Sequence, residues 1–213
     1  MNAARAELRK LLTLPSLRRT VLLTWGATGL LAYGYASAAA RGQAVTDDAA
    51  LAPLLYTQAG FLVLGALAAA SEYQGGGQIR ATLLAMPRRL PLQAARMLTL
   101  AGVALPAAAV TAAISALVAG EPARIPAATA YLTLTTLLGS AVAVLARRAV
   151  PAVLSLFLLH FVAGPLLRSR FPGVAALLPD TAALDPSTGL PATIAWVAAA
   201  VAAATAAFHH RDA

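Results

Sequence analysis

The uncharged stretch MLTLAGVALPAAAVTAAISALVA, residues 97–119, decides the fold class of this chain. A helix needs about 20 mainly apolar residues to cross the hydrocarbon core of a bilayer, and this stretch supplies them without interruption. Arg96 precedes it and Glu121 follows it closely, so charged residues bracket the apolar run. We therefore predict a transmembrane helix over 97–119.

Five further apolar runs extend this pattern along the chain. The 213 residues are 60% hydrophobic and only 11% charged, with a mean hydropathy of +0.74. A soluble domain carries about a quarter charged residues. The expected fold is thus all-α, a single integral membrane domain over 1–213 whose six transmembrane helices lie within 20–208. The predicted spans are 20–40, 52–70, 97–119, 127–146, 150–167 and 191–208.

The basic residues are distributed unevenly between alternate loops. Twelve of the sixteen lie before the first span, in the second and fourth loops, and after the last span, and four lie in the other loops. The positive-inside rule places loops rich in Arg and Lys in the cytoplasm, so both termini are expected there. Because the basic residues sit at the ends of apolar runs and not along one face, nucleic-acid binding is not expected.

Residues 1–19 have an amphipathic pattern. One helical face carries apolar side chains and the other carries basic ones: Ala4, Leu8, Leu11 and Leu12 against Arg9 and Lys10. Such a segment is predicted to lie in the cytoplasmic interface of the lipid bilayer, with Pro15 ending the helix. A solvated tail is one alternative. A signal peptide cleaved near Ala36 and Ala38 is another, which the length of the first apolar run disfavours.

The predicted spans contain no Asp, Glu, Lys or Arg, and this narrows the function. Ion-coupled carriers keep ionisable groups at membrane depth to bind and release the coupling ion. His160, between Phe157 and Phe161, is interpreted as a hydrogen-bonded packing residue. The chain has no cysteine, no H-E-x-x-H motif and no phosphate-binding loop, so we predict neither catalytic residues nor a metal site.

A weakly polar stripe runs along the fourth span, where Thr129, Thr133, Thr136 and Ser140 recur at helical spacing. Small residues allow transmembrane helices to approach closely, and hydroxyl groups can bond across the contact. We predict a helix-packing face here, with a hydrophilic lining of a transport path as the alternative.

The stretch SEYQGGGQIRATLLAMPRR, residues 71–89, interrupts the apolar pattern between the second and third spans. The glycines at 75–77 cannot sustain a helix, so the chain is expected to turn there. Ile79, Leu83 and Met86 then share one helical face, and Pro87 stops the helix. We predict a short helix near the cytoplasmic surface of the membrane.

This loop resembles the first cytoplasmic loop of the ABC-2 type transporter permeases, which are membrane subunits of bacterial ATP-driven exporters. Six spans with both termini inside match that family, and the abundance of Ala and Arg over Lys fits a GC-rich, actinobacterial genome. The segment 171–190 is similar to the family's outer loop, whose short re-entrant helices precede the last span. The chain departs from the family pattern at Gln78 and at Arg96.

The resemblance implies that the coupling loop, residues 72–90, docks on a separate ATP-binding cassette subunit. The implied contact residues are Glu72, Tyr73, Arg80, Thr82, Pro87 and Arg88. Anchoring to the membrane surface is the alternative for Arg88 and Arg89. ATP and Mg²⁺ would be bound by the partner subunit and no cofactor by this chain, which would not be an enzyme by itself. A second permease copy, or a related permease, would complete the exporter in the bacterial plasma membrane.

Four aromatic residues are candidates to contact the cargo: Tyr56, Phe61, Phe157 and Phe161. Helix packing is the alternative for all four. An uncharged interior favours an amphipathic or hydrophobic substrate, such as a drug, natural product, peptide or lipid. Two other functions remain open: a non-transporting immunity or scaffold protein, and an ion-coupled carrier, which the lack of charge within the spans disfavours.

Overall fold

The computed structural model describes residues 3–43, 51–71, 89–180 and 185–211. These ranges contain eight α-helices and no β-strand, which confirms the all-α prediction. The helices are α1 (Ala3–Thr13), α2 (Pro15–Ala40), α3 (Leu54–Ala70), α5 (Arg89–Ala119), α6 (Ile125–Ala146), α7 (Ala149–Phe157), α8 (Gly164–Arg170) and α9 (Pro186–Arg211). Three short segments connect them: the 3₁₀ helices η1 (Pro122–Arg124) and η3 (Pro172–Leu177), and the π-helix η2 (Leu158–Ala163).

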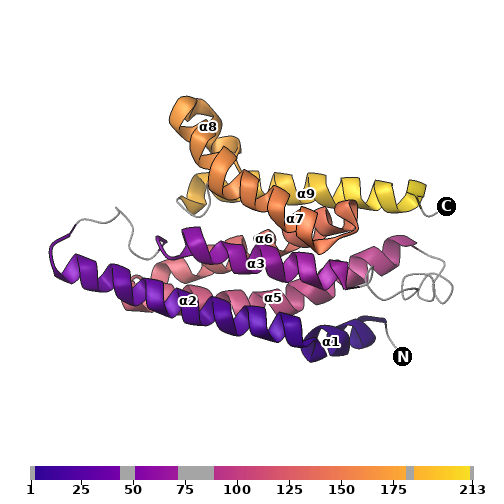
Figure 1. Ribbon diagram of the computed structural model, residues 1–213, viewed down its shortest axis with the longest axis horizontal. Helices are drawn as coiled ribbons and strands as arrows, with labels where there is room; N and C mark the ends of the chain where they lie inside the picture. The colour runs from indigo at the N-terminus through magenta and orange to yellow at the C-terminus, as the bar shows by residue number, and fades with distance from the viewer. Residues whose placement is uncertain (1–2, 44–50, 72–88, 181–184, 212–213) are drawn as a thin grey trace.

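The long helices run back and forth along the long axis of the molecule (Figure 1). The start of α1 and the end of α9 lie at the same end of the bundle. The end of α3 and the start of α5 lie at that end as well. We call this the terminal end, and the opposite one the far end. Successive helices therefore alternate in direction, as they do in a multi-pass membrane protein.

Four stretches of helix in the described ranges are long and apolar enough to cross a membrane: Gln93–Ala119, Pro122–Ala146, Ala149–Arg170 and Gly189–Ala207. They correspond to the third through sixth predicted spans. The first two predicted spans also form helices, but α3 has only 17 residues. α2 has 26 residues but carries two arginines near its start, Arg18 and Arg19, and three threonines along its length. The chain thus has the helix content of a multi-pass membrane protein.

The fifth predicted span is longer than the sequence suggested. α7, η2 and α8 join into one continuous rod from Ala149 to Arg170, whereas Pro165 was expected to limit the span to 150–167. Pro165 lies two residues after the π-helix, in the first turn of α8, where the hydrogen-bond spacing is already altered, so its missing N–H does not end the helix. The candidate span therefore extends beyond the predicted 150–167 and takes in Arg168 and Arg170 at its end.

The core of the bundle is built around α6. In its apolar stretch 61% of the residues are buried, whereas only 22% are buried in the stretches of the rod and of α9. α3 packs so closely on α6 that glycine is required at the contact. A Cβ atom on Gly139 would lie 2.5 Å from the carbonyl oxygen of Leu62, and one on Gly65 would meet the backbone at Thr136 and Ser140. The backbones of the two helices are therefore in direct contact.

The predicted threonine stripe contributes to this contact. Thr136 and Ser140 are buried on the face of α6 that meets Gly65. The hydroxyls of Thr133 and Thr136 donate to carbonyl oxygens of their own helix, at 2.8 Å and 3.0 Å, and not across to α3. The stripe is a packing face, as predicted, and close backbone approach rather than side-chain hydrogen bonding is the reason.

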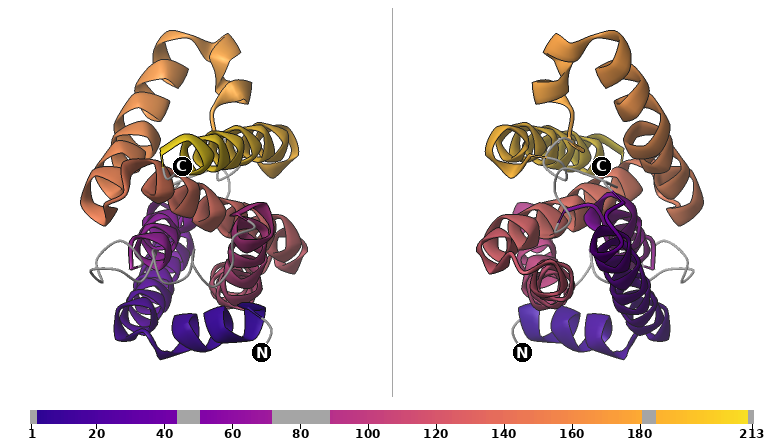
Figure 2. Two further views of the ribbon diagram at one scale, coloured as in Figure 1. Left: turned by 90° about the vertical axis from the view of Figure 1, so that its right-hand side faces the viewer. Right: turned by 90° about the vertical axis from the view of Figure 1, so that its left-hand side faces the viewer.

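α1 crosses the terminal end of the bundle, beneath the ends of α2 and α5 (Figure 2). Leu11 is buried in the main core cluster, whereas Leu8 and Leu12 are exposed. The helix ends at Thr13, before Pro15, which is instead the first residue of α2. Proline is favoured at that position because its fixed φ suits a helix start and its missing N–H has no partner there.

Candidate functional site

Two of the aromatic residues predicted to contact cargo line one open groove. Tyr56 on α3 and Phe157 on α7 face a cavity of about 350 Å³ between α2, α3 and α7. Phe161 packs edge-on against Phe157, with ring centroids 5.5 Å apart. Phe61 lies elsewhere, buried in the main core cluster. The structure therefore brings Tyr56, Phe157 and Phe161 to one side of the bundle and leaves Phe61 in the interior.

The surface of this groove is apolar despite its three threonines. Thr20, Thr24 and Thr57 each donate a hydrogen bond to a carbonyl oxygen four residues earlier in the same helix, at 2.7–3.1 Å. Their hydroxyl protons are thus already used, and the remaining lining is mainly aliphatic. A mostly apolar concave surface with few polar groups suits a hydrophobic or amphipathic ligand.

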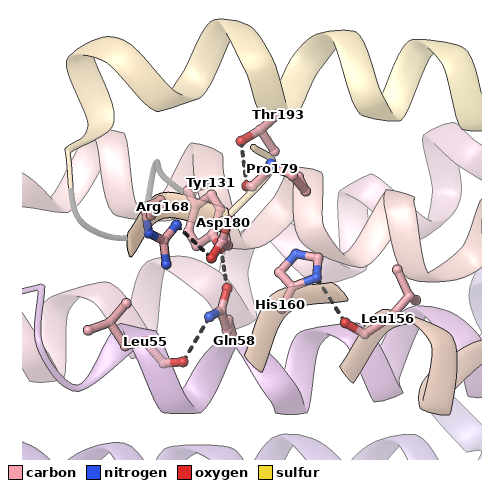
Figure 3. A network of polar contacts seen from close by, with 9 residues as sticks. All are labelled: Leu55, Gln58, Tyr131, Leu156, His160, Arg168, Pro179, Asp180 and Thr193. Atoms are coloured by element: carbon pink, nitrogen blue, oxygen red, sulfur yellow. Dashed lines mark hydrogen bonds and ion pairs between the residues drawn. The ribbon is translucent and has the colours of Figure 1, made fainter. Parts of the chain in front are cut away.

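A buried cluster of polar side chains lies near the far end (Figure 3). The Arg168 Nη1 atom of α8 lies 2.7 Å from the Asp180 Oδ2 atom, and the two side chains are 18% and 2% exposed. Asp180 fits closely because residue 164 is glycine: a Cβ there would lie 2.6 Å from Oδ2. This buried ion pair was not predicted, since both residues were assigned to an outer loop.

Three more residues surround the ion pair. The Tyr131 hydroxyl of α6 donates to the Oε1 atom of Gln58 on α3, and the Gln58 amide donates to the Leu55 carbonyl oxygen at 2.8 Å. His160, within the π-helix, places Nδ1 3.0 Å from the Leu156 carbonyl oxygen. A carbonyl can only accept, so Nδ1 carries a proton and donates it to Leu156.

Three atoms of this cluster have no hydrogen-bond partner within the described ranges: His160 Nε2, Asp180 Oδ1 and Arg168 Nη1, the last of which lies in the ion pair with Asp180 Oδ2. His160 and Asp180 are at most 2% exposed. Buried polar atoms are usually paired, so these atoms distinguish the cluster from an ordinary packing contact. His160 is hydrogen-bonded, as the packing interpretation predicted, but only at one of its two nitrogens.

The segment that carries Asp180 is fastened to α9. The Thr193 hydroxyl donates to the Pro179 carbonyl oxygen at 2.9 Å, and the Trp196 indole donates to the Leu177 carbonyl oxygen at 2.9 Å. Of the segment 171–190, where short re-entrant helices were predicted, the described part contains the 3₁₀ helix η3 and the start of α9 at Pro186. Residues 181–184 lie outside the described ranges. Residues 171–180 therefore join the rod to α9 through the polar cluster.

Sequence reasoning missed Arg168 and Asp180 because position in a polar-looking loop says little about burial. Two features of the sequence pointed weakly to burial. Apolar residues precede Asp180, and Gly164 lies one helical turn before Arg168. Neither signal pairs the two residues, because twelve positions separate them and the turn between them is irregular.

The residues implied in coupling to an ATPase lie outside the described residues: Glu72, Tyr73, Arg80, Thr82, Pro87 and Arg88. The structure bounds their loop, since α3 ends at Ala70 and α5 begins at Arg89. Comparisons of the chain with protein-family models, with curated proteins and with solved structures find no match.

Proposed function

We propose that this chain is the permease subunit of an ATP-driven exporter in a bacterial plasma membrane. The observation that carries the proposal is that α3 ends and α5 begins at the terminal end, so the two helices that flank the 71–89 loop meet it there. If that end faces the cytoplasm, a separate ATP-binding cassette subunit carrying ATP and Mg²⁺ has direct access to the loop. The resemblance of the loop to those of ABC-2 permeases supports such docking.

The proposed topology has six passes, with α2 and α3 joining the four candidate spans. Arg18, Arg19, Arg96, Arg147 and Arg148 lie at or near helix ends on the terminal side. In the described ranges, ten basic residues belong to the segments at the terminal end and four to those at the far end: Arg41, Arg124, Arg168 and Arg170. This asymmetry supports a cytoplasmic terminal end.

Reporter fusions test this topology directly. A reporter joined after the C-terminus is expected to be active only as a cytoplasmic marker, and one inserted at Gly42 or at Gly120 only as an external marker. Both glycines have positive φ in turns at the far end, at 71° and 77°, so they are suitable insertion points. An external signal from the C-terminal fusion would contradict the six-pass arrangement.

The groove of Tyr56 and Phe157 supports the substrate class. Its apolar lining favours a hydrophobic or amphipathic molecule, such as a drug, natural product, peptide or lipid. Two copies of the chain, or this chain and a related permease, would pair in the membrane. The groove lies on an outer face of the single chain, so a pairing partner could complete the path.

The coupling proposal is tested by purification from the native membrane in a gentle detergent. We expect an ATP-binding subunit to co-purify with the wild-type chain and to be lost from Glu72→Arg, because a reversed charge would oppose its docking surface. The matched control is Glu121→Arg, which changes the net charge equally at an exposed site of the far end. Its complex should remain intact.

If no ATPase co-purifies with the wild-type chain under conditions that preserve other membrane complexes, the exporter proposal fails. A non-transporting immunity or scaffold protein would then explain the membrane bundle better. Loss of the ATPase from both charge-reversed variants would instead indicate a general charge effect and would contradict a specific role for Glu72.

An ion-coupled carrier is a second candidate, favoured by one observation that the sequence did not anticipate. His160, Arg168 and Asp180 are ionisable groups buried within the bundle, as carriers require. The two candidates differ in their energy source. Transport that persists after ATP depletion and stops when the ion gradient is dissipated would favour the carrier, and the reverse result would favour the exporter.

A further inference from the structure

A second groove lies at the terminal end, on a different face from the cargo groove. It has a volume of about 370 Å³ and is bounded by α1, α2 and α5, with Leu64 of α3 at its floor. Figure 2 shows α1 crossing beneath the ends of α2 and α5. This helix therefore lies across the outer end of the groove. None of the four aromatic residues predicted to contact cargo is among its lining residues.

The walls of this groove are apolar and open to the surroundings. Leu12, Leu22 and Val110, one from each wall helix, are 56%, 61% and 41% exposed. Trp25 lines the groove and donates its indole N–H to the Ala107 carbonyl oxygen at 3.2 Å, which ties α2 to α5 at this level. Exposed leucine and valine around a concave surface indicate an apolar occupant.

The length of the groove matches one leaflet of a bilayer. Its lining on α2 extends from Leu17 to Trp25, which at 1.5 Å per residue is about 12 Å along the helix. The hydrocarbon core is about 30 Å thick, so one leaflet contributes about 15 Å. An acyl chain that enters beside α1 would therefore fill the groove without crossing the midplane.

One charged residue, Arg18, lines the groove, in the first turn of α2 and at its terminal end. Its side chain is exposed and makes no ion pair with any other side chain in the described part of the chain. Arg19 is also exposed but is not among the residues that line the groove. Among its described lining residues, the groove thus combines an apolar interior with one guanidinium at its mouth, which is complementary to a lipid with an anionic headgroup.

We propose that the groove between α1, α2 and α5 binds one anionic phospholipid from the leaflet at the terminal end. An acyl chain lies against Leu22 and Val110, and the lipid phosphate is bound by Arg18. α1 holds the lipid in place by crossing the end of the groove. This site is independent of the exporter proposal, because it requires neither an ATPase nor transported cargo.

The test is native mass spectrometry of the full-length, delipidated protein with phosphatidylglycerol or phosphatidylcholine of identical acyl chains. We expect one phosphatidylglycerol to remain bound under conditions that remove phosphatidylcholine. Arg18→Gln should weaken phosphatidylglycerol binding by roughly fivefold, the contribution of one basic side chain near an anionic headgroup. Arg19→Gln removes the same charge one position away and should retain wild-type binding.

The apolar part is tested separately. Val110→Phe fills the groove while leaving every charge in place, and is expected to abolish retention of the lipid. Val118→Phe, on the same helix at a comparably exposed position outside the groove, is the control and should bind normally. Circular dichroism of each purified variant verifies that the helices are intact.

Four results would overturn the proposal. Equal retention of the two lipids would show that charge is not recognised. Equal weakening by Arg18→Gln and Arg19→Gln would indicate diffuse electrostatic attraction in place of a site. Normal binding by Val110→Phe would place the lipid elsewhere. Displacement of the lipid by an equal concentration of soluble glycerol phosphate would show that a free phosphate is sufficient.

Discussion

Asp180→Ala is expected to lower the free energy of unfolding by about 3–5 kcal/mol, the cost of leaving one partner of a buried ion pair uncompensated. Arg168 would remain with its side chain 18% exposed and without the carboxylate that now lies 2.7 Å away. Unfolding of the detergent-solubilised protein by a denaturing surfactant, followed by circular dichroism, measures the loss.

The chain contains its own control for this prediction. Glu121 and Arg124 form an ion pair at 3.4 Å, in which the Glu121 side chain is 48% exposed and the Arg124 side chain is 45% exposed. Glu121→Ala is expected to cost less than about 1 kcal/mol, because water solvates both groups. The double variant Arg168→Met, Asp180→Leu should recover most of the stability lost in Asp180→Ala. Equal losses for Asp180→Ala and Glu121→Ala would contradict the burial of the pair.

Gly139→Ala is expected to destabilise the bundle by about 1–3 kcal/mol, because the added methyl group must displace the backbone of α3. The contacting atom is the Leu62 carbonyl oxygen, 2.5 Å from the added Cβ, and a backbone atom cannot move aside as a side chain can. The same surfactant titration measures the effect. Gly65→Ala, from the opposite side of the contact, should act in the same direction.

Gly26→Ala provides the matched control. Gly26 lies within α2, and an added Cβ would have no neighbour within 4 Å. Alanine has a higher helix propensity than glycine, by about 1 kcal/mol, so this variant is expected to be at least as stable as the wild type. A loss in Gly26→Ala equal to that in Gly139→Ala would mean that the α3–α6 contact is not the cause.

Helix class and approximate positions could be predicted from the sequence, because uninterrupted apolar runs leave few alternatives to membrane-crossing helices. The 97–119 and 127–146 spans lie inside helices of the structure. The threonine stripe of α6 also indicated a packing face, since small residues at helical spacing permit close approach. These features depend on local composition and periodicity, which a sequence records directly.

The polar cluster could not be predicted in the same way. Whether Pro165 ends a helix depends on the hydrogen bonding of the preceding turn, which here is π-helical. Because the helix continues, Arg168 reaches the level at which residues 178–180 fold back. Burial of Asp180 follows from this irregular turn and from its attachment to α9 through Thr193. Such long-range placement leaves no periodic trace in the sequence.

The helices are unequally buried, so amino-acid substitutions are tolerated at some positions of this protein during evolution and not at others. Val150, Leu154 and Leu158 on the outer side of the rod are all more than half exposed, so any residue of similar apolarity can replace them. Gly65 and Gly139 admit no such exchange. Homologues of this chain should therefore drift rapidly over the rod and slowly along the α3–α6 contact. A search anchored on the spacing of those two glycines should detect relatives that similarity over the whole chain misses.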